Sequence, residues 1–563
     1  MREVGGASES TSRLADDSIA RSAEALPNLV LTGFMGTGKT SVGREVARRL
    51  GREFVDVDAE IEARAGRSIP SIFAEDGEAA FRQLEAALIR ELSQRASLVI
   101  ATGGGALIDP ANRAAMARSG TIVCLTCDVN GILRRIAAQG DVRRPLLEVA
   151  DPRIEIERLM RARQEAYAAI PWHIDTTELS VTEVADRVIA LAEVVTLGVR
   201  HPEGEYPVRV GAGLLSCLGG ALRATGAREK SRVAVVTDSV VGPLYGAVTE
   251  ETLRSAGFQA FTCVIPSGEQ HKTLATVATL YDQFLVGELD RGDTVLALGG
   301  GVIGDIAGFA AATFMRGVRF AQVPTTLLAM VDASVGGKTG VDLPQGKNLV
   351  GAFKQPALVL IDPSVLATLP EEERRSGMAE VLKHGIIGDV DLFVALEAGE
   401  HVNQPGGRVS CGSVSLFAGQ LARAIQVKIE IVEQDPFEQG RRAVLNLGHT
   451  VGHALEKLSN YSRRHGEAVA IGMVAASRIA VALGRAEPSL ADRIEAALTT
   501  WGLPVRCPPF DVDAVCEAMM NDKKRRGRSL RWVLPRVLGQ VEIADDVPLD
   551  VVRSILKDQG ARS

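Results

Sequence analysis

Two groups of residues in this chain could do chemistry, and they lie far apart in the sequence. The first is the segment Gly33-Phe-Met-Gly-Thr-Gly-Lys-Thr40. Its glycines let backbone N–H groups turn toward phosphate oxygens, its lysine can neutralise phosphates, and its threonine can hold Mg²⁺. The second group is Glu380, His449, His453 and His465. Two imidazoles and one carboxylate with an open fourth position are typical of catalytic zinc. We therefore expect a phosphate-binding loop and a separate metal centre.

The residues around the glycine-rich segment favour a nucleotide site. Residues 28–32 predict a short buried strand, and residues 41–50 have helical spacing. The motif requires this order of strand, glycine loop and helix, and the positive end of the helix dipole would face the phosphates. A plain glycine turn is the alternative, but the lysine, the threonine and the context all point to a nucleotide. We predict that ATP is bound by Gly36, Thr37, Gly38, Lys39 and Thr40.

Two aspartates follow on the next predicted strand, residues 54–58. Alternation along a strand places Asp56 and Asp58 on one face, opposite the valines. A pair of surface carboxylates is the alternative, but acids beside a phosphate-binding loop suit a Mg²⁺ shell and a substrate that carries an alcohol. Further along, a predicted strand ends in Gly103-Gly-Gly105, where backbone can approach a ligand closely.

Residues 27–190 resemble the shikimate kinase family. The resemblance is carried by the glycine loop, the Asp-x-Asp pair, Phe81-Arg-x-x-Glu85, the triple glycine, Arg144-Pro-Leu-Leu147 and Arg163-x-x-x-Tyr167. It implies transfer of the ATP γ-phosphate to shikimate, with Lys39 and Arg144 acting in catalysis and Arg144 on a lid over ATP. Mg²⁺ would be held by Thr40 and Asp56. Shikimate would be held by Asp58, Arg82, Gly104 and Arg163. Two planar guanidinium groups suit its carboxylate.

The second part of the chain predicts a dinucleotide-binding sheet followed by helices. From 208 to about 370, strands such as 232–237, 261–265 and 294–298 alternate with helices, as in a parallel sheet with crossovers. The last of these strands leads into a glycine turn at 299–304, which alone is weak evidence for a dinucleotide. Carboxylate, ammonium and hydroxyl groups are expected at the ends of neighbouring strands. They strengthen the evidence for a dinucleotide site, since open α/β sheets bind ligands at that edge. Beyond 370, helical patterns include 371–384, 416–433 and 490–501.

Glu380, His449 and His465 come from separate segments of this helical region. His449 and His453 are four residues apart and share a helix face, so spacing alone would make both of them ligands. A buried or surface imidazole is the alternative for any one histidine. The chain has only eight histidines, so their clustering is informative.

Residues 193–563 resemble the 3-dehydroquinate synthase family, most specifically at Met378-Ala-Glu-Val-Leu-Lys383 and Leu445-Asn-Leu-Gly-His449. The resemblance assigns Zn²⁺ or Co²⁺ to Glu380, His449 and His465, and gives His453 a role toward the substrate. It implies that NAD is bound by Asp238, Glu269, Lys272, Gly300, Gly301, Asp305, Thr325, Thr326, Lys338 and Lys347. The substrate pocket would contain Arg316, Asp332, Lys338, Asn348, Lys383, Lys428, Arg442, Asn446 and His453. Of these, Lys338, Lys383, Lys428, Asn446 and His453 would act in catalysis. Either Lys523 or Lys524 would also reach the site.

The implied reaction converts DAHP, a seven-carbon keto sugar-acid phosphate, into 3-dehydroquinate. NAD⁺ would oxidise a ring hydroxyl, phosphate would leave, hydride would return and an internal aldol reaction would close the ring. Several lysines and arginines suit a substrate that carries a phosphate and a carboxylate. The alternatives are another sugar-phosphate cyclase, a metal-dependent polyol dehydrogenase that consumes NAD, and a first unit that binds nucleotide only for regulation.

The length and composition of the chain limit the number and type of its domains. The 563 residues, 46% of them hydrophobic, predict an α/β protein of three or four folding units. We expect a tail at 1–26, a kinase-like domain with a parallel sheet at 27–192, a Rossmann-like NAD-binding domain at 193–370 and a mostly helical metal-binding domain at 371–563. A net charge of −7 argues against nucleic-acid binding, and no apolar run is long enough for a membrane. Seven scattered cysteines favour the cytoplasm, and a homodimer through the synthase unit is a further expectation.

Overall fold

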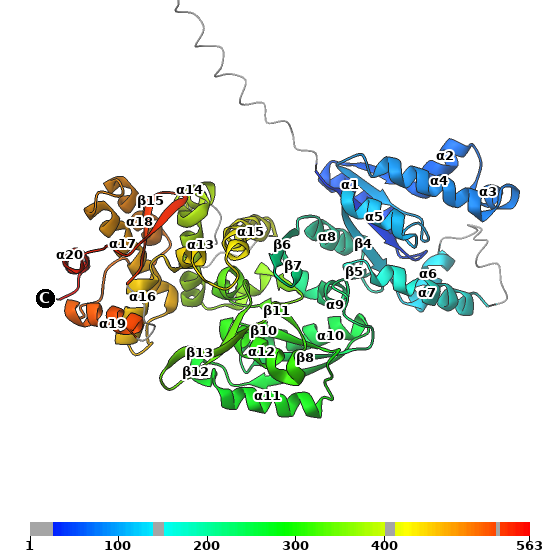
Figure 1. Ribbon diagram of the computed structural model, residues 1–563. Helices are drawn as coiled ribbons and strands as arrows, with labels where there is room; N and C mark the ends of the chain where they lie inside the picture. Colours follow the sequence, from blue (N-terminus) through cyan, green and yellow to red (C-terminus); the bar gives the residue numbers. More distant parts are fainter. Residues whose placement is uncertain (1–25, 139–150, 400–410, 525–529, 563) are drawn as a thin grey trace, which may run out of the picture. The chain divides into compact units, whose positions relative to one another are not determined.

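The computed structural model describes residues 26–138, 151–399, 411–524 and 530–562, and the chain divides into two compact units, Met1–Ala192 and Glu193–Ser563 (Figure 1). Both units are built on parallel sheets flanked by helices, and the end of the second unit is mostly helical. The predicted α/β class is therefore confirmed. Within the described residues, no helix is both long enough and apolar enough to span a membrane.

The first unit contains a five-stranded parallel sheet in the order β2-β3-β1-β4-β5. Its strands are β1 (Asn28–Gly33), β2 (Glu53–Asp56), β3 (Leu98–Ala101), β4 (Gly120–Thr126) and β5 (Trp172–Asp175). Its helices are α1 (Lys39–Leu50), α2 (Val57–Ala65), α3 (Ile69–Glu75), α4 (Gly77–Leu92), α5 (Pro110–Ser119), α6 (Val129–Ala138), α7 (Pro152–Ala168) and α8 (Val181–Ala192). Strands β1 and β3 are entirely buried, as the apolar runs of their sequences require.

One local prediction in this unit was wrong. Asp56 and Asp58 do not share the face of a strand, because β2 ends at Asp56 and α2 begins at Val57. The Asp56 carboxylate accepts a hydrogen bond from the Ala59 amide at 3.4 Å and so caps the helix. An aspartate that can cap a helix competes with continuation of the strand, and Asp58 therefore lies in the first turn of α2.

The second unit begins with a seven-stranded sheet in the order β6-β7-β14-β11-β10-β8-β9, parallel except for the β6–β7 pair. The strands are β6 (Val195–His201), β7 (Gly204–Val210), β8 (Arg232–Asp238), β9 (Gln259–Ile265), β10 (Thr294–Gly299), β11 (Arg319–Pro324) and β14 (Val359–Ile361). Its helices are α9 (Leu218–Arg223), α10 (Ala247–Ser255), α11 (Leu274–Val286) and α12 (Gly301–Thr313). The hairpin of β12 (Lys338–Leu343) and β13 (Gly346–Phe353) was not anticipated.

One hydrophobic cluster of the core lies on a face of this sheet near the glycine turn. Side chains of β8, β9 and β10 pack there against α11, α12 and Val341 of the hairpin, and Leu280, Phe284 and Ile306 are fully buried. Burial of such apolar surface is the main stabilising contribution to folding. The packing fixes the amino-terminal end of α12 against the end of β10.

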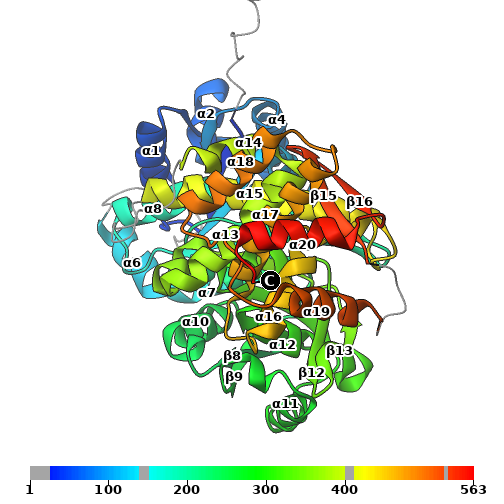
Figure 2. The same cartoon turned by 90° about the vertical axis from the view of Figure 1, so that its left-hand side faces the viewer.

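The remaining helices gather into one region, which Figures 1 and 2 show from two sides. They are α13 (Glu371–Gly388), α14 (Val390–Glu397), α15 (Cys411–Gln434), α16 (His449–Leu458), α17 (His465–Ala482), α18 (Pro488–Thr500), α19 (Val512–Lys524) and α20 (Leu549–Gln559). A second hairpin, β15 (Trp532–Val537) with β16 (Gln540–Ala544), accompanies them. Helix α17 packs against α13, α16, α18 and α20 and is buried along most of its length.

Candidate active sites

The glycine-rich segment forms the turn between β1 and α1. Gly36 and Gly38 adopt positive φ angles of 77° and 93°, which favour glycine and let the backbone curl before the helix. The Lys39 ammonium group donates to the carbonyl oxygens of Gly33 and Phe34, each at 3.0 Å, and therefore folds back over the turn. Burial lowers the pKa of Lys39 to about 8, although the carboxylates of Asp58 and Asp56 oppose the effect.

The Thr40 hydroxyl donates to the Asp56 carboxylate at 2.8 Å. This pairing brings two oxygen ligands together beside the turn, which is the donor set that Mg²⁺ prefers. Burial, followed by the nearby Asp56 carboxylate, raises the pKa of Asp58. Arg135 also lies at this turn, where it donates to the Gly36 carbonyl at 3.3 Å and to the Thr176 hydroxyl at 2.8 Å.

The triple glycine is the point where the predicted shikimate-binding side chains meet. A Cβ atom on Gly103 would lie 2.6 Å from the Asp58 carboxylate, one on Gly104 would lie 2.9 Å from the Arg163 guanidinium, and one on Gly105 would lie 2.9 Å from that of Arg82. Each glycine therefore makes room for a different charged group. The structure brings together Asp58, Arg82, Gly104 and Arg163, whereas Arg144 lies outside the described residues.

Buried partners position the two arginines. Arg82 donates to the Glu85 carboxylate at 2.8 Å, and the Glu85 side chain is only 2% exposed. Arg163 donates to the Gly104 carbonyl at 3.0 Å, and the Tyr167 hydroxyl donates to the same oxygen at 2.6 Å. Two guanidinium groups held in place at a glycine-lined surface can bind a carboxylate.

In the second unit, most of the residues predicted to bind NAD lie at the carboxyl ends of parallel strands. Asp238 ends β8, Gly300 and Gly301 follow β10, and Thr325 follows β11. The Thr325 amide donates to the Gly299 carbonyl at 2.9 Å, which joins two of these ends. Ligands of open α/β sheets bind at this edge, and the amide groups at the start of α12 face it. Thr326 lies beside Gly300, where an added Cβ would meet its methyl group at 3.1 Å.

Two lysines connect this edge to the β12–β13 hairpin. The Lys272 ammonium group lies 2.5 Å from Asp305 Oδ2 and 2.6 Å from Asn348 Oδ1. Lys347 lies 3.1 Å from the Glu269 carboxylate. Lys272 thus contacts one group predicted to bind NAD and one predicted to bind DAHP, so the two predicted sites adjoin.

The predicted substrate pocket is formed mainly by three buried cations. Lys428 donates to Asp332 Oδ1 at 2.6 Å, and Lys383 forms an ion pair with Glu380. The Arg442 guanidinium donates to the Pro436 carbonyl at 2.9 Å. Burial lowers the pKa of Lys428 to about 8, with Asp332 opposing the effect. Asn446 is half-buried at the end of the short helix Arg441–Asn446, three residues before α16.

Four of the predicted substrate contacts are exposed, namely Arg316, Lys338, Asn348 and His453. Lys338 is 48% exposed and donates to the Glu438 carboxylate at 2.6 Å. Arg316 is exposed beyond the carboxyl end of α12, and a helix of that length places it about 20 Å from Gly301. Lys524 lies at the end of α19, next to residues that the structure does not describe.

The three predicted metal ligands converge. Glu380 is fully buried on α13, and its Oε1 atom lies 3.7 Å from His449 Nε2 and 3.6 Å from His465 Nε2. These separations are too long for hydrogen bonds. They are close to the roughly 3.3 Å that separates two ligands of a tetrahedral zinc ion with bonds of about 2.0 Å. Glu380 Oε1 is buried without a hydrogen-bond donor, whereas Oε2 pairs with Lys383. The residues therefore fit a divalent metal ion.

The charge states of His449 and Glu380 match this donor set. Burial, reinforced by Lys383, lowers the pKa of His449 well below its usual value, which keeps the imidazole neutral. Burial alone would raise the pKa of Glu380, but Lys383 and the histidines hold it below its usual value. Burial by itself would lower the pKa of His465, yet Glu380 and Glu456 raise it to about 10, so a metal ion that binds here must displace a proton from the ring. His453, one turn after His449 on α16, faces the same cluster, since its ring centroid is 6.2 Å from that of His465.

Sequence reasoning missed Glu438 and Glu456. Glu438 lies in the loop after α15 with a φ angle of 57°, and it reaches Lys338 about a hundred residues away. Glu456 lies on α16 and contacts His465. The helical spacing of His449, His453 and Glu456 was the available signal for the second residue. No spacing rule could have identified the first.

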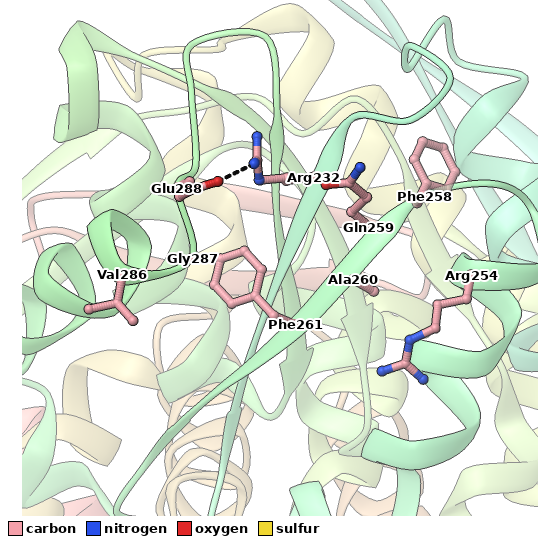
Figure 3. Close-up of a pocket in the computed structure, with 9 residues that line it drawn as sticks. All are labelled: Arg232, Arg254, Phe258, Gln259, Ala260, Phe261, Val286, Gly287 and Glu288. Carbon is pink, nitrogen blue, oxygen red and sulfur yellow. Dashed lines mark hydrogen bonds and ion pairs between the residues drawn. The ribbon is translucent and has the colours of Figure 1, made fainter.

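An open hollow of about 520 Å³ lies away from these groups, at the outer edge strand β9 (Figure 3). Phe258, Phe261 and Val286 line it together with an ion pair between Arg232 and Glu288. None of the predicted site residues lines it, so it does not contribute to either active site.

Known protein families match the two units of the chain separately. Residues 35–193 match the family model for shikimate kinase. Residues 262–376 and 377–525 match those for the N-terminal and C-terminal parts of 3-dehydroquinate synthase. A 3-dehydroquinate synthase from Synechococcus sp. is 47% identical over 365 residues, which cover 64% of this chain and 98% of that protein. The chain belongs to the 3-dehydroquinate synthase family. Its first unit adds a shikimate kinase domain, so the predicted fusion of two enzymes is confirmed.

Two further relatives extend over the synthase unit. The 3-dehydroquinate synthase of Synechocystis sp. is 47% identical over 363 residues, 64% of this chain and 99% of the relative. The solved structure of 2-epi-5-epi-valiolone synthase from Streptomyces hygroscopicus, with NAD⁺ and Zn²⁺ bound, is 31% identical. It covers 64% of this chain and 98% of its own, with a TM-score of 0.57.

Proposed function

We propose that the synthase unit converts DAHP into 3-dehydroquinate with release of phosphate, and that it requires NAD and a divalent metal ion. The observation that carries this proposal is the convergence of buried Glu380 and His449 with partly buried His465, beside the cations of the predicted pocket. The identity of 47% to named 3-dehydroquinate synthases supports this substrate over that of another sugar-phosphate cyclase. We further propose a cytoplasmic location, which is supported by six cysteines of the described residues that are buried without disulfides.

The proposed cofactors would be held by residues already described. Zinc, or cobalt, would be held by Glu380, His449 and His465, and NAD by the strand ends and by Lys272. When bound, NAD⁺ accepts and returns a hydride, and the metal ion polarises the hydroxyl that is oxidised. The NAD⁺ and Zn²⁺ in the valiolone synthase structure support the same cofactors here.

The side chains of the chain would bind the substrate and move its protons. Lys428, Arg442 and Lys383 present cations from separate elements, so a phosphate and a carboxylate could be bound at different ends of the site. Glu438 holds the Lys338 ammonium group, and His453 offers an imidazole on the exposed side of the metal cluster. An imidazole and a carboxylate are suited to general acid and base catalysis near neutral pH.

We propose that the kinase domain phosphorylates shikimate with ATP and Mg²⁺. The backbone of residues 36–40 and the Lys39 ammonium group would bind the phosphates, and Thr40 and Asp56 would hold Mg²⁺. Arg82 and Arg163 would bind the shikimate carboxylate, with Asp58 accepting a hydrogen bond from a hydroxyl. Positioning and charge neutralisation account for most catalysis of phosphoryl transfer.

The decisive experiment supplies the purified chain with DAHP, catalytic NAD⁺ and Zn²⁺, and follows phosphate release, ring formation and absorbance of NADH. We expect phosphate and 3-dehydroquinate in equal amounts without net NADH. Stoichiometric NADH would instead indicate a polyol dehydrogenase. In a parallel assay, ADP formation should depend on shikimate, and nucleotide binding without such turnover would indicate a regulatory domain.

A further inference from the structure

The two imidazoles of the metal trio present the same ring nitrogen to Glu380. In both His449 and His465, Nε2 faces Glu380 Oε1. The opposite nitrogen, Nδ1, is anchored in each ring. His449 Nδ1 lies 3.1 Å from the Leu447 carbonyl oxygen, and His465 Nδ1 lies 3.3 Å from Glu456 Oε1. Because carbonyl and carboxylate oxygens can only accept, each Nδ1 carries a proton, and in the neutral ring that binds a metal ion Nε2 keeps its lone pair.

The groups that accept from the two Nδ1 atoms differ in charge and in their position in the fold. His449 is 11% exposed and is bound by a neutral backbone carbonyl close to it in sequence. His465 is the first residue of α17 and is 28% exposed. Neighbouring side chains therefore restrain the rotation of its ring less than they restrain that of His449. The anchor of His465 comes from another helix, since Glu456 lies on α16, which packs against α17.

The Glu456 carboxylate is well placed for this purpose. Its side chain is 10% exposed, and no lysine or arginine in the described part of the chain lies within ion-pair distance of it. A buried carboxylate without a cationic partner is costly unless a hydrogen bond satisfies it. His465 supplies that bond, and Glu456 lies seven residues after His449, two turns along the same face of α16. One helix thus carries one predicted ligand and the anchor of the other.

We propose that Glu456 is a positioning residue for the metal centre: it fixes the tautomer and the rotation of His465 so that Nε2 points at the metal. The proposal rests on the metal site of the proposed function and deepens it. A carboxylate that accepts from a metal-binding imidazole makes the other nitrogen a stronger donor, and removal of such partners costs metal affinity. Glu456 was not among the residues that sequence reasoning assigned.

A direct role in metal binding is the competing explanation. Donor atoms of His453, Glu456 and His465 all lie within 4.8 Å of one another and could share an ion. The two roles predict different effects of Glu456→Gln. A glutamine oxygen still accepts a hydrogen bond from Nδ1–H, so a positioning role is largely preserved, whereas an amide is a poor replacement for a carboxylate ligand.

The test measures zinc affinity of the full chain by competition with a chromophoric chelator. The variants are Glu456→Ala, Glu456→Gln and His465→Ala, with Glu467→Gln as the matched control. Glu467 lies two residues after His465 on α17 and pairs with Arg463 at 3.8 Å. Kinase turnover and NAD binding by each variant report whether the two units remain folded.

We expect Glu456→Ala to weaken zinc binding by about 10- to 100-fold. Glu456→Gln should lose only a few-fold, His465→Ala should lose the most, and Glu467→Gln should match the parent. Zinc affinity of Glu456→Ala within two-fold of the parent would overturn the proposal, as would a loss in Glu456→Gln as large as that in His465→Ala. A parent chain that binds no stoichiometric zinc would instead refute the metal site of the proposed function.

Discussion

The ammonium group of Lys272 donates to the side chain of Asn348 at 2.6 Å while it forms an ion pair with Asp305 at 2.5 Å. Asp305 lies on α12, one turn after the glycine turn, and Asn348 lies on the β12–β13 hairpin. Lys272 itself is 4% exposed. A single buried cation therefore holds a group on the proposed NAD side against a group on the proposed sugar-phosphate side.

Replacement of this cation should affect both ligands at once. Lys272→Met leaves Asp305 without its partner, and loss of one member of a buried pair costs about 3 kcal/mol of stability. We expect the Kd for NAD and the KM for DAHP each to rise by at least about tenfold. Denaturant unfolding and NAD titration measure these effects. The control for the unfolding measurement alone is Lys347→Met, because the Lys347–Glu269 pair is more than one-third exposed on both sides and should contribute less than about 1 kcal/mol. Equal destabilisation by both changes would contradict the prediction.

The geometry of the metal trio distinguishes His449 from His453, although helical spacing alone would make both of them ligands. His449 Nε2 faces Glu380, whereas the ring of His453 lies on the exposed side of the cluster. We expect His449→Ala to lose bound zinc, and His453→Ala to retain zinc but lose at least about 100-fold in kcat if its imidazole transfers a proton. Elemental analysis of the purified variants gives the zinc content. Equal zinc loss in the two variants would show that both are ligands.

The buried lysine of the substrate pocket should make the synthase sensitive to alkaline pH. Burial lowers the pKa of Lys428 to about 8, with Asp332 opposing the effect. Lys428 is therefore a cation below this pH and becomes neutral above it. If it binds an anionic group of DAHP, the KM should rise as pH increases through about 8.

The conservative variant tests the cause of that pH dependence. Arginine stays protonated throughout the range, so Lys428→Arg should move the increase in KM to higher pH, even if its absolute KM differs from that of the parent. KM measured between about pH 6 and pH 10 in both proteins provides the comparison. An unchanged midpoint in the arginine variant would assign the effect to another group.

The features that the sequence alone could predict are those set by residues close to one another in the chain. The phosphate-binding turn depends on eight consecutive residues, and the pair His449–His453 depends on one turn of helix, so local spacing was sufficient for both. Asp58 was misplaced because a side-chain cap on α2, which alternation does not anticipate, ended the strand early. The contacts of Lys272 with Asn348 and of Lys338 with Glu438 join residues 76 and 100 positions apart. They depend on where a hairpin and a loop pack, which no local pattern encodes.

The triple glycine of the kinase domain allows the shikimate side to be tested separately from the ATP side. A Cβ atom on Gly104 would lie 2.9 Å from the Arg163 guanidinium, and one on Gly105 would lie 2.9 Å from that of Arg82. Each alanine variant therefore displaces one of the two arginines proposed to bind the shikimate carboxylate. A charge-assisted hydrogen bond contributes about 1.5–3 kcal/mol, so Gly104→Ala and Gly105→Ala should each raise the KM for shikimate by about 10- to 100-fold.

The two substrates of the kinase provide the internal control for these variants. Gly105→Ala lies beside Arg82 and away from the nucleotide turn, so its KM for ATP should stay at the parental value. In Gly104→Ala the added Cβ atom would also lie 3.3 Å from the Gly33 carbonyl, at the start of that turn, so a rise in the KM for ATP of up to about two-fold is compatible with the prediction. Synthase turnover of the same preparations should equal that of the parent, because all the altered contacts lie within the first unit. Equal increases in the KM values for shikimate and ATP in Gly105→Ala would mean that the triple glycine supports the whole domain rather than the shikimate site.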